Sequence, residues 1–210
     1  MAHLILMRHA KSEWNKLGLW TGWTDVSLSK EGEKEAENSA AYLKGIPIHK
    51  AYTSTLKRAK ETWDIVRHAI GLAHIPAEAH DALKERHYGH FTGKNKWEVK
   101  KEIGEEAFQK IRRGWNHPIP GGETLKKVSE RVMPFYHERV FPEIVSGNSV
   151  ILIAHGNSLR SLVKHLEDIH EDDIHRIEIG VGEAWIYTLD NSGKVVSKEI
   201  RAENLEKGKI

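Results

Sequence analysis

The chain has 210 residues, 39% hydrophobic and 30% charged, which is the balance expected of one large globular domain. Its formal net charge of +2 is too small to indicate binding to nucleic acid or to a membrane surface. There is no cysteine, which excludes disulfides, thiolate nucleophiles and cysteine metal sites. No apolar run has the length of a membrane span and no signal peptide precedes the first apolar run, so we expect a cytoplasmic enzyme.

The first predicted element is a short buried strand over residues 4–7, which ends at Arg8 and His9. In an open parallel sheet, ligands bind just beyond the carboxyl ends of the strands. A guanidinium matches the geometry of a phosphate, and a neutral imidazole can act as a nucleophile. The same construction recurs where the apolar run 150–154 ends at His155. We therefore expect two histidines to meet at one edge of a sheet.

The rest of the chain alternates between helical and strand patterns. Two loops are expected at 16–28 and 81–93, and Arg58 falls in the first turn of a helix that follows a strand. In chain order, the patterns first predict a helix from Lys30 to about Lys44 with Ser29 as its cap, a strand over 51–53 and a helix that ends at Gly71. Two short helices are expected next, ending near Gly104 and Gly114. The last predicted elements are a helix from about Thr124 that Pro134 could kink, a helix including 159–166 and a hairpin over 184–200.

This alternation predicts an α/β fold. It implies a mainly parallel central sheet with helices on both faces and an antiparallel C-terminal edge hairpin. We expect residues 1–210 to form a single catalytic domain, with a polar and mobile tail from residue 202.

Several blocks carry a family resemblance. Arg8-His9-Ala10 resembles the Arg-His-Gly signature of the histidine phosphatase superfamily. The longer blocks resemble one branch, the cofactor-dependent phosphoglycerate mutases; these blocks are Trp20-Thr21-Gly22-Trp23, residues 52–59, Glu85-Arg86-His87-Tyr88-Gly89 and His155-Gly156-Asn157-Ser158-Leu159-Arg160. The last two blocks are the most specific to the mutases. The resemblance implies a phosphoglycerate mutase-like fold and the interconversion of 3-phosphoglycerate and 2-phosphoglycerate in glycolysis and gluconeogenesis.

The resemblance also implies roles for individual residues. His9 would become a phosphohistidine primed by 2,3-bisphosphoglycerate, with no metal required. Arg8, Arg58 and His155 would stabilise the transferred phosphoryl group, and Glu85 would be the general acid and base. The substrate-binding residues implied are Ser12, Asn15, Thr21, Gly22, Tyr88, Lys96, Arg112, Arg113, Gly156 and Asn157. The partners implied are small-molecule phosphoglycerates, and a homodimer or higher homo-oligomer is possible.

Simpler interpretations stand beside these roles. Arg112 and Arg113 could form a solvated helix face, and the tryptophans at 14, 20 and 23 could form a small apolar cluster. A metal site among the histidines at 165, 170 and 175 is disfavoured, because a spacing of five does not keep them on one helix face.

Two departures limit the resemblance. Ala10 and Lys11 replace a usual glycine and a usual acid, and the connection over 114–124 is shorter than in the longer mutases. The sequence also leaves open whether the tail, with Asn204, closes over the site.

Two alternatives to a mutase remain. The first is a phosphatase of the same superfamily that hydrolyses a small phosphoester through the same phosphohistidine. The second is a non-catalytic anion-binding regulator, against which the intact set of proposed catalytic residues argues.

Overall fold

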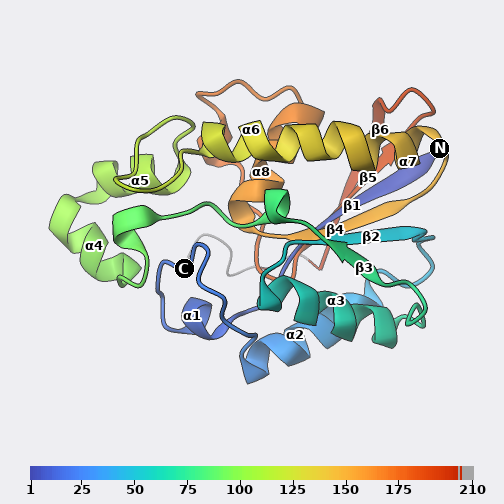
Figure 1. Ribbon diagram of the computed structural model, residues 1–210, viewed down its shortest axis with the longest axis horizontal. Coiled ribbons are helices and arrows are strands. Elements are labelled where there is room, and N and C mark those ends of the chain that lie inside the picture. Colours follow the sequence, from blue (N-terminus) through green and yellow to red (C-terminus); the bar gives the residue numbers. More distant parts are fainter. Residues whose placement is uncertain (203, 205–210) are drawn as a thin grey trace.

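A six-stranded sheet lies at the centre of the computed structural model, which describes residues 1–202 and 204 (Figure 1). Its strand order is β3-β2-β4-β1-β5-β6, with parallel pairing from β3 to β1 and antiparallel pairing of β5 with β1 and β6. The strands are β1 (Ala2–Arg8), β2 (Lys50–Thr53), β3 (Ala77–Ala79), β4 (Val150–Ala154), β5 (Ala184–Leu189) and β6 (Val195–Arg201). The predicted mainly parallel sheet with an antiparallel C-terminal hairpin is confirmed.

Helices cover both faces of this sheet, as predicted (Figure 1). The α2 helix (Lys30–Ala41) and α3 (Lys57–Ala69) pack on one face, and α6 (Leu125–Phe135), α7 (Phe141–Val145) and α8 (Gly156–Leu166) pack on the other. The apolar run of β1 is continuous because both faces of this strand are buried. Leu4 and Leu6 face the core under α6 and α8, and Ile5 and Met7 face the core under α2 and α3.

The helix boundaries agree with the sequence patterns at most ends. Ser29 caps α2 by accepting a hydrogen bond from the Gly32 amide, and Thr124 caps α6 in the same way. The α2 helix ends at Ala41, earlier than predicted. Pro134 does not end its helix, because α6 continues through a π-helical turn (Tyr136–Val140) into α7.

A small lobe extends beyond the carboxyl ends of β1 and β4 (Figure 1). It contains α4 (Lys96–Ile103) and α5 (Glu105–Arg113), both predicted, and the one-turn helix α1 (Glu13–Lys16) lies nearby. Trp20 is buried in the apolar cluster of this lobe, as expected, whereas Trp23 is 42% exposed and the prediction for it is wrong. None of the described helices combines the length and the apolar character needed to cross a membrane.

Candidate active site

The two histidines meet because their strands are parallel neighbours. In the register of β1 and β4, Arg8 lies opposite Ala154, so the next residue on each strand emerges at the same edge of the sheet. The His9 amide donates to the Ala154 carbonyl oxygen at 3.0 Å, and the ring centroids of His9 and His155 are 4.9 Å apart. Both side chains are buried.

The His9 ring is held in one tautomer. Its Nδ1 lies 2.7 Å from the Ala10 carbonyl oxygen, which can only accept, so Nδ1 carries the proton. Nε2 therefore has a free lone pair, which accepts a hydrogen bond from Arg58 Nε at 3.3 Å. Burial, followed by the charges of Arg58 and Arg8, holds the pKa of His9 well below its usual value. At neutral pH this ring is uncharged and its Nε2 can act as a nucleophile.

Ala10 fits its position without strain. Among the described residues other than glycine, only Asp168 and Ala202 have a positive φ, so Ala10 needs no left-handed backbone. Its side chain is buried, and its amide donates to Thr62 Oγ1 at 3.1 Å. The missing glycine of the family signature is thus compatible with the local geometry.

Arg58 is aimed at His9 by the loop over 21–24. Its two terminal nitrogens donate to the carbonyl oxygens of Gly22 at 2.9 Å and Thr24 at 3.0 Å. Burial lowers the pKa of Arg58 to about 10, which still leaves it charged at neutral pH. Gly22 thus reaches the site through its backbone, whereas the buried Thr21 hydroxyl has no hydrogen-bond partner among the described residues.

Two other predicted substrate residues have a structural role here. Ser12 and Asn15 form a reciprocal cap at the start of α1, in which Ser12 Oγ accepts from the Asn15 amide. Neither residue lines the site cavity described below.

His155 is oriented by Ser54, a residue for which the sequence analysis predicts no role. Ser54 Oγ lies 2.7 Å from His155 Nε2 and accepts from the Leu56 amide at 3.3 Å. That oxygen can donate its own proton to Nε2, and in this arrangement the ring proton of His155 lies on Nδ1. Nδ1 is buried and no described residue accepts its hydrogen bond. Burial, with the charge of Arg58 next, holds the pKa of His155 well below its usual value.

The Glu85 carboxylate is held at the N-terminus of α8. Its Oε1 accepts from the Asn157 amide at 3.2 Å, from Asn157 Nδ2 at 2.9 Å and from the Arg86 amide at 2.7 Å. Gly156 lies next to both groups, since a Cβ there would be in ordinary contact with Glu85 Oε2 at 3.6 Å and with Arg8 Cζ at 3.7 Å. The carboxylate and the Arg8 guanidinium therefore face the same small space.

The backbone of Glu85 is fixed as well. Its carbonyl oxygen accepts from Trp23 Nε1 at 2.7 Å and from Arg131 Nη2 at 3.0 Å. Arg131 lies on α6, also donates to the carbonyl oxygens of residues 82 and 84, and pairs with Glu123. Trp23 and Arg131 are thus supports that sequence reasoning missed, since only the tertiary fold brings them to Glu85.

A cavity of about 70 Å³ lies between these groups and the lobe. It is lined by eight of the predicted residues and by Trp20, Arg160, Glu178 and Ile179, which were not predicted. The predicted ones are Arg8, Glu85, Tyr88, Lys96, Arg112, Arg113, Gly156 and Asn157. Arg160 is the last residue of the block that begins at His155, and it donates to Asn157 Oδ1 at 3.1 Å. Glu178 lies in no block of the family resemblance, and no local sequence pattern indicates that it belongs to the site.

Positive charge dominates this cavity. Burial, followed by the charges of Arg8 and Arg112, lowers the pKa of the half-buried Lys96 to about 7. Arg8 donates through Nη1 to the Ile179 carbonyl oxygen at 2.7 Å, but its buried Nε has no acceptor among the described residues. Buried donors without acceptors beside several cations indicate a site for an anion.

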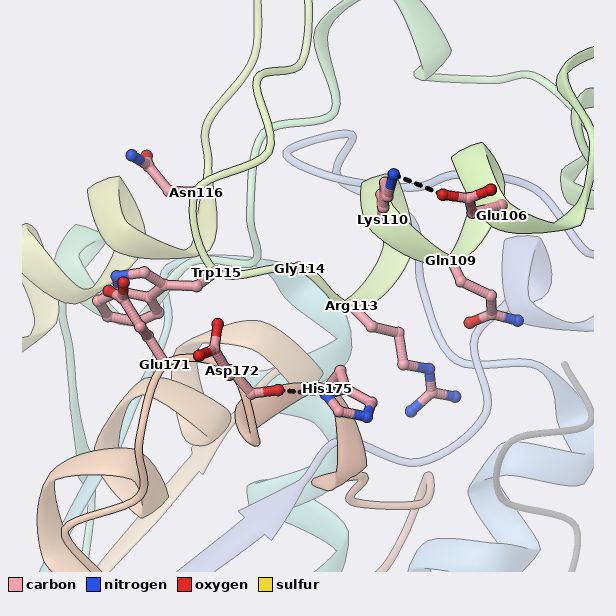
Figure 2. A pocket seen from close by; sticks show the side chains of 10 residues that line it. All are labelled: Glu106, Gln109, Lys110, Arg113, Gly114, Trp115, Asn116, Glu171, Asp172 and His175. Atoms are coloured by element: carbon pink, nitrogen blue, oxygen red, sulfur yellow. Dashed lines mark hydrogen bonds and ion pairs between the residues drawn. The ribbon is translucent and has the colours of Figure 1, made fainter.

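A second, larger pocket of about 830 Å³ shares only Arg113 with this site (Figure 2). It lies between the end of α5 and residues 171–175, and Trp115 forms part of its wall. Neither His9 nor Glu85 borders it. In the part of the chain that the structure describes, no group of three His, Asp or Glu side chains is placed to hold a metal ion.

The family match rests on nearly the whole chain. A profile of the histidine phosphatase superfamily (branch 1) matches residues 4–200. The chain belongs to this superfamily. It is 42% identical over 202 residues to the 2,3-bisphosphoglycerate-dependent phosphoglycerate mutase of Parvibaculum lavamentivorans, covering 95% of this chain and 96% of that one. It is also 42% identical to a phosphoglycerate mutase of Schizosaccharomyces pombe, over 94% of both chains.

Two solved structures share the fold. YhfR of Bacillus stearothermophilus superimposes with a TM-score of 0.80 at 27% identity, over 93% of this chain and 94% of that one. The alpha-ribazole phosphatase of Shigella flexneri superimposes with a TM-score of 0.79 at 20% identity, over 96% of both chains. At that identity, the second comparison describes the fold alone.

Proposed function

We propose that this chain is a 2,3-bisphosphoglycerate-dependent phosphoglycerate mutase, with residues 1–210 acting as one catalytic domain. The observation that carries the proposal is the neutral His9, whose Nε2 accepts from Arg58, while its chain neighbour Arg8 lines a cavity shared with Glu85 and further cations. The mutases at 42% identity support the same activity. The cytoplasm is the compartment we propose, since the reaction belongs to glycolysis; the oligomeric state stays a prediction.

In the first half-reaction His9 accepts the phosphoryl group. The lone pair of Nε2 forms a bond to phosphorus while the ester P–O bond breaks, and its electron pair leaves with the substrate oxygen. Glu85 acts here as the carboxylic acid: it gives its proton to that oxygen and is left as the carboxylate. Arg8 Nε and His155 Nδ1, the buried donors without acceptors, bind the equatorial oxygens together with Arg58.

In the second half-reaction Glu85 takes a proton from the other hydroxyl of the bound glycerate, and that oxygen attacks the phosphohistidine. The cations of the lobe, Lys96, Arg112 and Arg113, hold the carboxylate end during both steps. When bound, 2,3-bisphosphoglycerate supplies the phosphoryl group that primes His9. Arg8, whose buried Nε has no acceptor among the described residues, and the cations of the lobe would hold its anionic groups.

The test is phosphorylation of His9. Incubation with 2,3-bisphosphoglycerate is expected to leave an acid-labile phosphate on His9, located by mass spectrometry, and catalytic amounts of it are expected to start conversion of 3-phosphoglycerate to 2-phosphoglycerate. His9→Ala is expected to abolish both signals. The exposed His175→Ala variant, a histidine outside the site, serves as the matched control.

A label on His155, or no label in an active preparation, would overturn the assignment. Turnover that is independent of 2,3-bisphosphoglycerate would remove the cofactor from the proposal.

A further inference from the structure

One carboxylate already occupies the end of the cavity where the proposed substrate would place its own. Glu178 Oε1 lies 3.5 Å from Arg112 Nη2, and Glu178 Oε2 pairs with Arg113 Nη2. The three side chains are only 13%, 16% and 20% exposed, for Arg112, Arg113 and Glu178 in that order. Glu178 also lines the cavity beside Lys96 and Arg8.

The substrate of the proposed reaction carries the same chemical group. A glycerate carboxylate has two oxygens with the spacing and charge of those of Glu178, and a substrate carboxylate placed between the two arginines needs the Nη2 donors that Glu178 now holds. We propose that Glu178 is an internal competitor for the substrate carboxylate and so determines specificity at this site. The inference rests on the proposed function, since it takes the carboxylate of phosphoglycerate as the displacing group.

The exchange needs little movement of the backbone. Arg8 Nη1 donates to the Ile179 carbonyl oxygen, which fixes the chain next to Glu178. The carbonyl oxygens of Arg112 and Arg113 accept from Arg86 and Arg160, which fixes the end of α5. Rotation of the Glu178 side chain is therefore sufficient to break its pairs with Arg112 and Arg113.

Competition of this kind selects ligands with two anionic ends. A small carboxylate without a phosphate must displace Glu178 without the contacts that a phosphate would make near His9. A phosphoglycerate gains contacts at both ends, so its phosphate contributes the free energy that releases Glu178. Glu178 thereby excludes lone carboxylates at the cost of some affinity for the substrate.

The test compares two ligands that differ only at the competing group. 3-Phosphoglycerate has a carboxylate, whereas glycerol 3-phosphate has a hydroxymethyl group in its place. Glu178→Gln keeps the shape and removes the charge, so we expect it to lower the Kd of 3-phosphoglycerate about tenfold. The Kd of glycerol 3-phosphate is expected to change less than about twofold, because that ligand does not need the guanidiniums.

Two further variants keep the result interpretable. Glu106→Gln makes the same change in net charge at an exposed position of α5, where Glu106 pairs with Lys110, and is expected to leave both affinities unchanged (Figure 2). Glu178→Asp keeps the charge but shortens the side chain, and is expected to fall between wild type and Glu178→Gln. If Glu178→Gln does not fold, Glu178→Asp takes its place in the comparison of the two ligands.

An equal decrease in Kd for both ligands in Glu178→Gln would mean a general charge effect. A higher Kd for 3-phosphoglycerate would mean that Glu178 positions the arginines. Either result overturns the inference. Isomerisation by the wild-type protein is measured in parallel. If that activity is absent, the proposed function has failed, whatever Glu178 does.

Discussion

At the scale of single residues, the site depends on which nitrogen of each buried histidine carries the proton. The Ala10 carbonyl settles this for His9, and the Ser54 hydroxyl is the hydrogen-bond partner of the His155 ring. Only one of these two is a side chain, so only Ser54 can be tested by substitution. A partner of this kind fixes the orientation of a catalytic ring without contacting the substrate itself.

Ser54→Ala is expected to lower kcat about tenfold or more, because His155 Nδ1 is no longer held as a hydrogen-bond donor to the phosphoryl group. The KM for 3-phosphoglycerate is expected to stay close to the wild-type value, and Ser54→Thr, which retains a hydroxyl, is expected to restore part of kcat. Ser161→Ala removes an equally buried hydroxyl that donates to the Ser158 carbonyl, away from His155, and is the control. An unchanged kcat in Ser54→Ala would contradict this role.

Lys96 gives the site a pH dependence whose sign can be worked out. In the free protein burial lowers its pKa to about 7, and a bound anion favours the charged form and raises that pKa. The complex therefore binds more protons than the free protein above pH 7, so affinity for 3-phosphoglycerate falls as pH rises. The slope approaches about tenfold per pH unit between pH 7 and 9.

Calorimetric Kd values across this range provide the measurement for Lys96. Lys96→Gln is expected to flatten the profile, whereas Lys101→Gln, an exposed lysine on the same helix, is expected to keep it. A wild-type Kd that does not change between pH 7 and 9 would remove Lys96 from the binding site.

At the scale of secondary-structure elements, the short connection over 114–124 is tied to the loop that carries Glu85. The His90 amide donates to the Pro120 carbonyl oxygen at 3.0 Å, and the Glu123 amide donates to the His87 carbonyl oxygen at 2.8 Å. Gly89 makes this close approach possible. A Cβ there would lie 2.1 Å from the Pro120 oxygen, and the φ of Gly89 is +49°.

Substitution at Gly89 is expected to disturb both loops. Gly45→Ala is the control. It is expected to lower the free energy of unfolding by about 1–2 kcal/mol through its positive φ alone, because no atom lies within 4 Å of the added Cβ. Gly89→Ala adds the collision with Pro120, about 1–3 kcal/mol more, and is expected to lower kcat because Glu85 shifts. Urea denaturation and steady-state kinetics measure the two effects. Equal stability losses in the two variants would show that the loop contact is loose.

How far the sequence predicts these elements depends on the length of the pattern. Long periodic segments such as α3 and α6 were predicted within a few residues, since each has an apolar face and an identifiable cap or stop. Strand β3 has only three residues and no apolar run, and α7 follows a proline and a π-helical turn, so neither has a local signal.

The same limit applies to the site. His9 and His155 could be predicted to meet because each follows a buried parallel strand. Glu178 could not, because it is 65 residues from Arg113 and only the packing of the lobe on the sheet brings them together. The family resemblance supplied Glu85 and Lys96, which composition alone would leave as surface charges.

At the scale of the whole molecule, the described chain encloses its own reaction centre. His9 and Arg58 are only 3% and 1% exposed, and His155 is fully buried. Residues of the lobe and of the loop over 81–93 line the cavity beside this centre, whereas no residue of the short loop over 114–124 does. A buried phosphohistidine is protected from water, which is what a mutase requires and a phosphatase does not.

The partition between isomerisation and hydrolysis tests this closure. At saturating 3-phosphoglycerate with catalytic 2,3-bisphosphoglycerate, we expect 2-phosphoglycerate to form faster than free phosphate by orders of magnitude. Arg113→Ala removes one wall of the cavity and a contact to the carboxylate, so the share of hydrolysis is expected to rise; Lys110→Ala, on the exposed side of α5, is the control (Figure 2). Glu85→Gln is expected to slow both products, because both need a proton on the leaving oxygen. Hydrolysis that matches isomerisation in the wild-type protein would mean that water reaches His9 as readily as the second hydroxyl does, and the phosphatase alternative would then describe this chain better.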